Sequence, residues 1–220
     1  MEWLQLLRDA APIMLRGAGY TVLFALAAMV GGLLIGFPVA VLRMLPYRLL
    51  AWPANVYVSL MRGTPLLVQM FVIYYGLPSV GIEFSPVTAG ILALSLNSGA
   101  FLSESLRGAI ASVSKGQWAA SYSLGLGYWR TLYYVVLPQA LRVAVPAMSN
   151  TLISLIKDTS LVSVITLTEL MLSTKEVIST TFQPLPLYLA AAAIYWMLSL
   201  LFEALQRRAE QRLNRAQRAR

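Results

Sequence analysis

Residues 17–42 contain no charged side chain and few polar ones. An α-helix needs about 20 apolar residues to cross the hydrocarbon core of a bilayer, and this stretch is longer than that. It is therefore predicted to be a transmembrane helix. Gly31, Gly32 and Gly36 lie within it and are predicted to let another helix pack closely.

Four more apolar stretches follow, and together they predict an all-α polytopic membrane protein with five transmembrane helices. The chain is 58% hydrophobic and only 12% charged, whereas about a quarter of the residues in an ordinary globular domain are charged. We interpret residues 1–220 as one transmembrane domain. The predicted spans are 17–42, 49–77, 87–110, 139–167 and 187–205.

The segments outside the spans are amphipathic or basic. Residues 1–16 lack the basic start and small-residue cleavage site of a signal peptide, and their apolar stripe predicts a helix lying on the membrane surface. Residues 168–186 are too polar to cross and are predicted to hold a second amphipathic helix. Residues 206–220 form an arginine-rich tail.

Five spans place the two termini on opposite sides of the membrane, and the basic residues indicate which side. With the C-terminal tail in the cytoplasm, twelve of the seventeen Lys and Arg residues lie inside, three outside and two at membrane depth. The positive-inside rule favours this orientation, with the N-terminus outside. It also accounts for the net charge of +8 without a nucleic-acid partner.

The polar stretch 115–138 separates the third and fourth spans and therefore falls in the cytoplasm. A helix is predicted over 117–124, with Gly125 in the left-handed conformation just past its end. A second helix is predicted over 128–137, and Pro138 either stops it or opens the next one. Its predicted apolar face comprises Trp129, Leu132, Tyr133 and Val136. Such a helix pair is suited to docking a partner; the alternative is that it only anchors the chain to the bilayer.

Four ionisable residues are predicted within the membrane or near its edge. They are Arg62, Glu104, Lys157 and Asp158. An unpaired charge at the bilayer centre costs about 2.5–3.5 kcal/mol on insertion scales, so these groups are expected either to pair across helices or to line a hydrophilic path. Lys157 and Asp158 are adjacent and therefore point in different directions on a helix. The sequence Arg62-Gly63-Thr64-Pro65 should kink the second span.

Several classes of chemistry are disfavoured by the residues themselves. The sequence has no His and no Cys, and its carboxylates at membrane depth are single, so neither a metal site nor a hydrolase is predicted. It also lacks the G-x-x-x-x-G-K-[ST] phosphate loop, so no cofactor is expected in this chain, and any ATP must be bound by another subunit.

Four segments carry a resemblance to a known family. Residues 116–118, 123–126 and 136–141 resemble the cytoplasmic EAA loop of bacterial ABC importer permeases. Residues 61–69 (MRGTPLLVQ), 104–108 (ESLRG) and 154–162 (SLIKDTSLV) resemble the polar amino acid subfamily, of the histidine, glutamine and arginine type.

This resemblance implies a non-enzymatic transport subunit in the inner membrane of a bacterium. Its expected partners are a second permease subunit (identical or related), two cytoplasmic ATPase subunits that bind ATP and magnesium, and an external solute-binding protein. ATPase coupling is expected at Gly116, Ala119, Ala120, Ser123, Leu124, Gly125, Leu126, Leu137 and Pro138. The solute path is expected at Arg62, Thr64, Asn97, Glu104, Lys157, Asp158 and Ser160.

The sequence departs from the family pattern at one position. Ala119 stands where the family usually has Glu, so docking should depend more on shape than on a charge at that point. The sequence thus predicts an ATP-driven permease subunit for a polar amino acid or a related small solute. The alternatives are an ATP-independent secondary transporter or channel, and a membrane scaffold that moves nothing.

Overall fold

The computed structural model describes residues 2–45 and 47–218, and throughout these residues the ordered elements are helical. The all-α prediction is therefore confirmed. The α-helices are α1 (Glu2–Met44), α2 (Arg48–Gly63), α3 (Leu66–Phe71), α4 (Pro86–Ala111), α5 (Lys115–Ser123), α6 (Tyr128–Thr131), α7 (Leu137–Asp158), α8 (Leu170–Thr181) and α9 (Pro184–Arg218). Two π-helical turns (Val72–Gly76 and Leu132–Val136) and two 3-10 helices (Leu77–Val80 and Thr159–Ile165) connect some of them.

Three of these helices are long and apolar enough to cross a membrane unaided. They are Trp3–Met44, Pro86–Ala111 and Pro184–Arg208. Two further candidates are bent pairs, Arg48–Gly63 with Leu66–Val80 and Tyr128–Ile165 with Leu170–Thr181. The described residues thus give three spans, or up to five if each bent pair counts as one.

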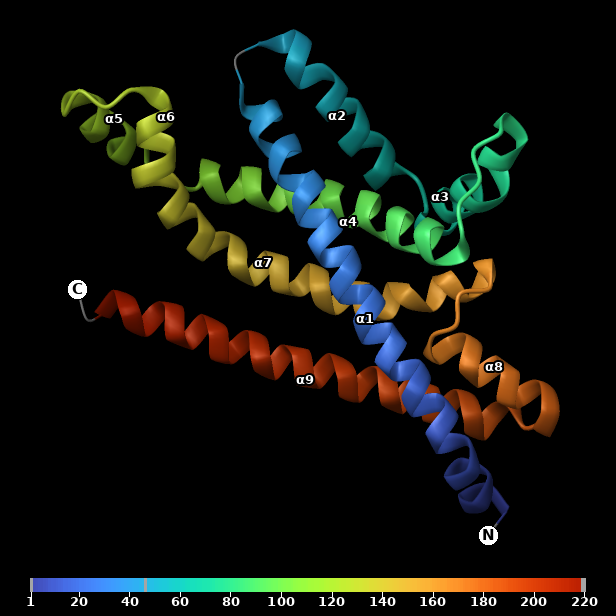
Figure 1. The fold of residues 1–220 in the computed structure, drawn as a ribbon. Coiled ribbons are helices and arrows are strands. Elements are labelled where there is room, and N and C mark those ends of the chain that lie inside the picture. Colours follow the sequence, from blue (N-terminus) through green and yellow to red (C-terminus); the bar gives the residue numbers. More distant parts are fainter. Residues whose placement is uncertain (1, 46, 219–220) are drawn as a thin grey trace.

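The termini lie at opposite ends of the helical assembly (Figure 1). The short helices α5 and α6 occupy the end at which α9 terminates, whereas α8 and the start of α1 occupy the other end. This arrangement agrees with termini on opposite sides of a membrane. It also places the polar stretch 115–138 on the side of the C-terminus.

The N-terminal segment does not form the separate surface helix that its amphipathic pattern predicted. Residues 2–44 form one continuous helix instead. The apolar stripe of the first turns is covered by protein, because Ala10 and Met14 pack with Leu170 of α8 and Leu187 of α9. The stripe has the spacing expected of a membrane-surface helix, but the surface that it covers belongs to the same chain.

The second predicted span is broken more severely than a proline kink. The axes of α2 and the segment that follows it differ by 108° across Thr64 and Pro65. Proline has no N–H to continue the helical ladder, and it disfavours helical conformation in the residue before it. Thr64 accordingly has extended backbone angles (φ −118°, ψ 147°). The break thus lies at the predicted residues, and the chain turns there by more than a proline kink would produce.

A buried carboxylate joins three elements at the N-terminal end of the molecule. Glu169 is fully buried and caps α8 by accepting a hydrogen bond from the Leu172 N–H at 2.9 Å. It also accepts bonds from the Tyr195 hydroxyl of α9 at 2.6 Å and the Thr21 hydroxyl of α1 at 3.3 Å. A buried carboxyl group is tolerated only when its oxygens are bonded in this way, so these contacts fix α8 between α1 and α9.

Glycines allow α1 to lie directly on α4, as the sequence predicted. A Cβ at Gly31 would lie 2.3 Å from the Ser95 hydroxyl oxygen, and one at Gly36 would lie 2.7 Å from the Gly99 carbonyl oxygen. Real Cβ contacts do not come this close, so only glycine permits the observed separation.

We expect Gly36→Ala to destabilise the protein, because backbone atoms of α4 cannot move aside as a flexible side chain can. Overpacking of this kind typically costs about 1–3 kcal/mol. The measurement is thermal unfolding in detergent. Gly19→Ala is the matched control, since Gly19 lies in the same helix and a Cβ added there would meet no atom within 4 Å. Equal unfolding temperatures for the two variants would contradict the packing argument.

Candidate functional site

Two amide side chains close the break between α2 and α3. The Gln69 amide nitrogen donates to the Met61 carbonyl at 2.9 Å and to the Thr64 carbonyl and hydroxyl at 3.1 and 2.9 Å. Asn97 of α4 donates to the same Met61 carbonyl at 3.1 Å and to the Gln69 amide oxygen at 3.1 Å. Carbonyls that lose their helical partner in an apolar environment must be satisfied in this way. Thr64 and Asn97, both predicted path residues, are thus brought together.

A carboxylate surrounded by three guanidinium groups lies further along α4. Glu104 accepts a hydrogen bond from Arg43 of α1 at 2.6 Å, pairs with Arg107 one turn away, and lies 3.7 Å from Arg62 of α2. Arg43 also donates to the Asn55 side chain at 2.8 Å. Of the two expectations for membrane-depth charges, pairing across helices is the one observed for Arg62 and Glu104. The cluster keeps an excess of two positive charges.

A polar cavity of about 380 Å³ lies between α4 and α7. Asn97 and Phe101 line it from α4, and Lys157 and Asp158 line it from the end of α7. Its remaining lining residues are Ser98, Asn150, Thr151, Ser154 and Leu155. Among the described side chains, Lys157 and Asp158 form no ion pair with each other, as their adjacency on a helix predicted, and none with another residue.

The structure divides the predicted path residues into two groups. Asn97, Lys157 and Asp158 line the cavity, whereas Arg62, Thr64 and Glu104 lie outside its lining. Ser160 is also outside it, since the α-helix gives way to the 3-10 helix at Thr159 and the Ser160 carbonyl accepts a bond from Ser163. Phe101 connects the groups, because the Arg62 guanidinium carbon lies 5.5 Å from the centre of its ring.

The turn after α5 has the geometry predicted from its glycine. Gly125 has φ +77°, its N–H donates to the Tyr122 carbonyl at 2.9 Å, and the Leu126 N–H donates to the Ser121 carbonyl at 3.1 Å. These two bonds form a Schellman motif, which satisfies the last carbonyls of a helix. The turn is therefore rigid although it lies on the surface.

Most of the predicted coupling residues are exposed. Leu126 and Leu137 are partly buried, whereas the exposed residues are Gly116, Ala119, Ala120, Ser123, Leu124, Gly125 and Pro138. Leu124 is the most exposed apolar side chain among them, at 81%. Behind the turn, Trp118 of α5 stacks on Tyr128 of α6 with ring centres 5.6 Å apart. The α5–α6 helix pair therefore has an inner side held by aromatic stacking and an outer side exposed to solvent.

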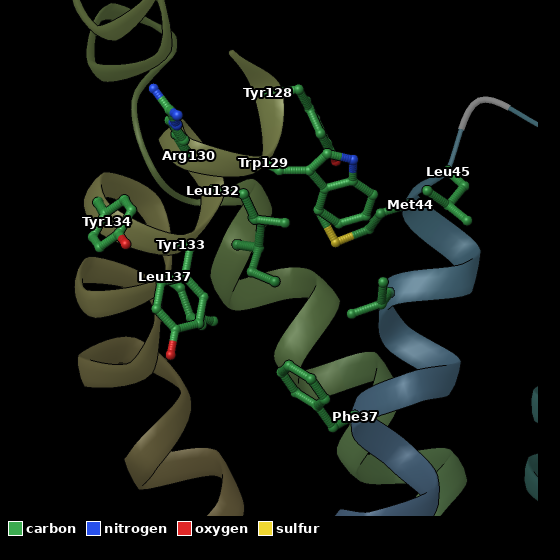
Figure 2. Close-up of a pocket in the computed structure, with 12 residues that line it drawn as sticks. Phe37, Met44, Leu45, Tyr128, Trp129, Arg130, Leu132, Tyr133, Tyr134 and Leu137 are labelled. Carbon is green, nitrogen blue, oxygen red and sulfur yellow. The ribbon is translucent and has the colours of Figure 1, made fainter. Parts of the chain in front are cut away.

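The second short helix does not end before the fourth span. Residues 128–165 form one continuous helical rod, in which the π-helical turn Leu132–Val136 precedes Pro138 in the first turn of α7. The four residues of the predicted apolar face are not buried as one surface. Leu132 and Val136 are buried, but Trp129 and Tyr133 are 57% and 67% exposed and line a pocket against α1 (Figure 2).

Sequence reasoning missed three side chains that organise this region. Arg43 and Asn55 were not singled out, and Gln69 appeared only within the motif at residues 61–69. Gln69 had a usable signal, because an amide four residues after a proline in an apolar helix needs a polar partner. Arg43 and Asn55 had none, since only the crossing of α1, α2 and α4 brings them together. Among residues 2–45 and 47–218, no group of acidic residues is arranged to hold a metal ion.

Comparison with known proteins gives close relatives over nearly the whole chain. Residues 32–215 match the family model described as binding-protein-dependent transport system inner membrane component. The chain is 45% identical to the probable amino-acid ABC transporter permease protein YckA of Bacillus subtilis over 86% of its length and 83% of the relative's. It is 43% identical to the L-cystine transport system permease protein TcyB of the same organism, over 93% and 88% of the two chains.

A solved structure shares both sequence and fold with the chain. A chain of the crystal structure of an amino acid ABC transporter with histidines is 33% identical and superimposes with a TM-score of 0.91, covering 96% of this chain and 99% of that one. A chain of the MetNI methionine ABC transporter in inward-facing conformations has the same fold at 20% identity, with a TM-score of 0.78. The chain belongs to the family of binding-protein-dependent transport system inner membrane components and is a membrane permease subunit of an ABC transporter.

Proposed function

We propose that the chain forms the translocation path of an ATP-driven importer for a polar amino acid or a closely related small solute. The cavity between α4 and α7 is the observation that carries this proposal. An amino acid has one carboxylate and one ammonium group, and Lys157 and Asp158 offer one partner for each in the same cavity. The amide and hydroxyl groups of Asn97, Asn150 and Ser154 supply further hydrogen-bonding groups around them.

The proposed energy source is a pair of cytoplasmic ATPase subunits that hold ATP and magnesium and seat on the α5–α6 turn. The exposed Leu124 and the rigid Gly125 turn support this docking site. The continuous helix that starts at Tyr128 supports the coupling, because it leads from the turn to Lys157 and Asp158 as one unbroken run of helical residues. At 1.5 Å per residue, the rod from Tyr128 to Asp158 is about 45 Å long.

The remaining assembly follows from the same proposal. A second permease subunit, identical or related, completes the path, and an external binding protein delivers the solute. The N-terminus then lies outside and the C-terminus in the cytoplasm, in agreement with the excess of Lys and Arg around α5, α6 and the end of α9. Related permeases named for L-cystine and for glutamine support the amino acid class.

We expect Lys157→Met and Asp158→Asn each to lower solute uptake at least tenfold, since each removes one charged partner of the solute. A tenfold loss corresponds to about 1.4 kcal/mol, a modest value for a hydrogen bond to a charged group. The measurement is ATP-dependent uptake of labelled amino acids by the reconstituted complex. Arg208→Met, which removes an exposed charge in the C-terminal third of α9, is the control and should transport normally. Normal uptake by both cavity variants would refute the assignment of this cavity.

We expect Gly125→Ala to leave the chain inserted but to reduce ATP-dependent uptake. A side chain at φ +77° costs about 1–2 kcal/mol, and the strain is relieved by changing the turn on which the ATPase would seat. Gly127→Ala is the matched control: this glycine also has open space around it, but its φ is −73°. Co-purification of the ATPase and uptake should fall for the first variant only. If both variants behave as the native protein, the turn is not the docking site.

A separate measurement distinguishes the alternative function. Vesicles that contain the permease without any ATPase subunit should show no solute-specific uptake. Uptake under these conditions would identify a secondary transporter or channel.

A further inference from the structure

An apolar pocket lies between the end of α1 and the beginning of the α6–α7 rod (Figure 2). Its volume is about 480 Å³, within the range of pockets that hold small molecules. The walls are formed from α1 by Phe37, Val41, Met44 and Leu45, from α4 by Ile110, and from the rod by Tyr128, Trp129, Arg130, Leu132, Tyr133, Tyr134 and Leu137. Arg130 is the one charged residue among them.

This pocket is separate from the proposed solute path. It shares no lining residue with the cavity between α4 and α7. The side chains on its rim are turned outward, since Tyr133 and Tyr134 are 67% and 71% exposed. A pocket with these walls offers a polar amino acid almost no hydrogen-bonding partners. Its chemistry suits a hydrocarbon chain.

The position of the pocket along the helices is that of a membrane–water boundary. Tyr and Trp side chains are enriched at this level in membrane proteins, and the rod contributes Tyr128, Trp129, Tyr133 and Tyr134 within two turns. On α1, the pocket extends from Met44, at the last turn of the helix, to Phe37. These two residues are about 10 Å apart along the axis, so one end of the pocket reaches into the hydrocarbon region.

The polar end of the pocket is positively charged. Arg130 is exposed, and among the described side chains it forms no ion pair. In Figure 2 its guanidinium group extends away from α1, on the side of the pocket where the chain continues into the α5–α6 turn. The sequence contains no Asp or Glu between Glu104 and Asp158, so no acidic neighbour along the chain neutralises this charge.

We propose that the pocket binds one acyl chain of an anionic phospholipid, whose phosphate is held by Arg130. The acyl chain lies against Phe37, Val41 and Leu137 and covers the exposed ring of Trp129. With the C-terminus in the cytoplasm, the lipid belongs to the cytoplasmic leaflet. The bound lipid packs against the π-helical turn that joins the coupling helices to α7.

The test uses the tryptophan in the pocket as a reporter. The four tryptophans other than Trp129 are replaced by Phe, and the full-length chain is reconstituted in phosphatidylcholine vesicles. Phosphatidylglycerol or phosphatidylcholine that is brominated near the glycerol end of the acyl chains is then added in increasing amounts. Brominated phosphatidylglycerol should quench Trp129 saturably, with an apparent affinity about fivefold higher than that of brominated phosphatidylcholine. A factor of this size is expected for one basic residue at an anionic membrane surface.

Two comparisons make the result decisive. A second protein that retains only Trp196, which is 66% exposed on α9, should be quenched equally by both lipids and without saturation. Arg130→Gln in the Trp129 protein should abolish the preference for phosphatidylglycerol. If Trp129 behaves as Trp196 does, the pocket contacts bulk lipid only, and if Trp129 is not quenched at all, protein covers it. Either result overturns the proposal, as does a preference that persists in Arg130→Gln.

Discussion

The amide groups of Gln69 and Asn97 hold together the point at which the helical backbone is broken. Pro65 removes a donor, and the chain turns by 108°, which releases carbonyls that no water can reach in hydrocarbon. Because Gln69 bonds the Met61 and Thr64 carbonyls and Asn97 bonds Met61 from α4, the break becomes a fixed corner. The corner places Arg62 within reach of Glu104 and leaves Asn97 at the edge of the polar cavity.

The ionisable groups within the bundle, like the released carbonyls, need bonding partners from the protein. Glu104 is shared by three arginines from α1, α2 and α4, and the fully buried Glu169 is bonded by groups from α1, α8 and α9. Each carboxyl group is bonded by side-chain or backbone groups from different helices, so each one fixes the crossing of three elements. Lys157 and Asp158 differ from them, because they face a cavity and have no protein partner among the described side chains. That difference separates the charges that hold the bundle together from the two that we propose as partners of the solute.

The connection from the α5–α6 turn to the cavity is continuous. The Schellman bonds at Gly125 fix the turn, Trp118 stacks on Tyr128 behind it, and the helical rod that begins there ends at the two cavity charges. A movement imposed on the turn therefore meets no break in the run of helical residues before the end of α7. The rod contains the π-helical turn and, further along, Pro146 in the interior of α7, and the proposed lipid packs directly beside the π-helical turn.

The sequence by itself determined the class of the protein, the apolar stretches, the left-handed glycine and the family motifs, because each depends on local chemistry or on the length needed to cross a bilayer. It also placed the break at Pro65 and the glycine contact of α1. Only the tertiary structure decided the angle at the break, the continuity of α1 and of the rod, and the partners of Glu104. Those outcomes depend on which helix packs against which surface. The apolar stripe at the start of α1 packs against α8 and α9 rather than lipid, and Arg43 contacts Glu104 only because α1 crosses α4 at its glycines.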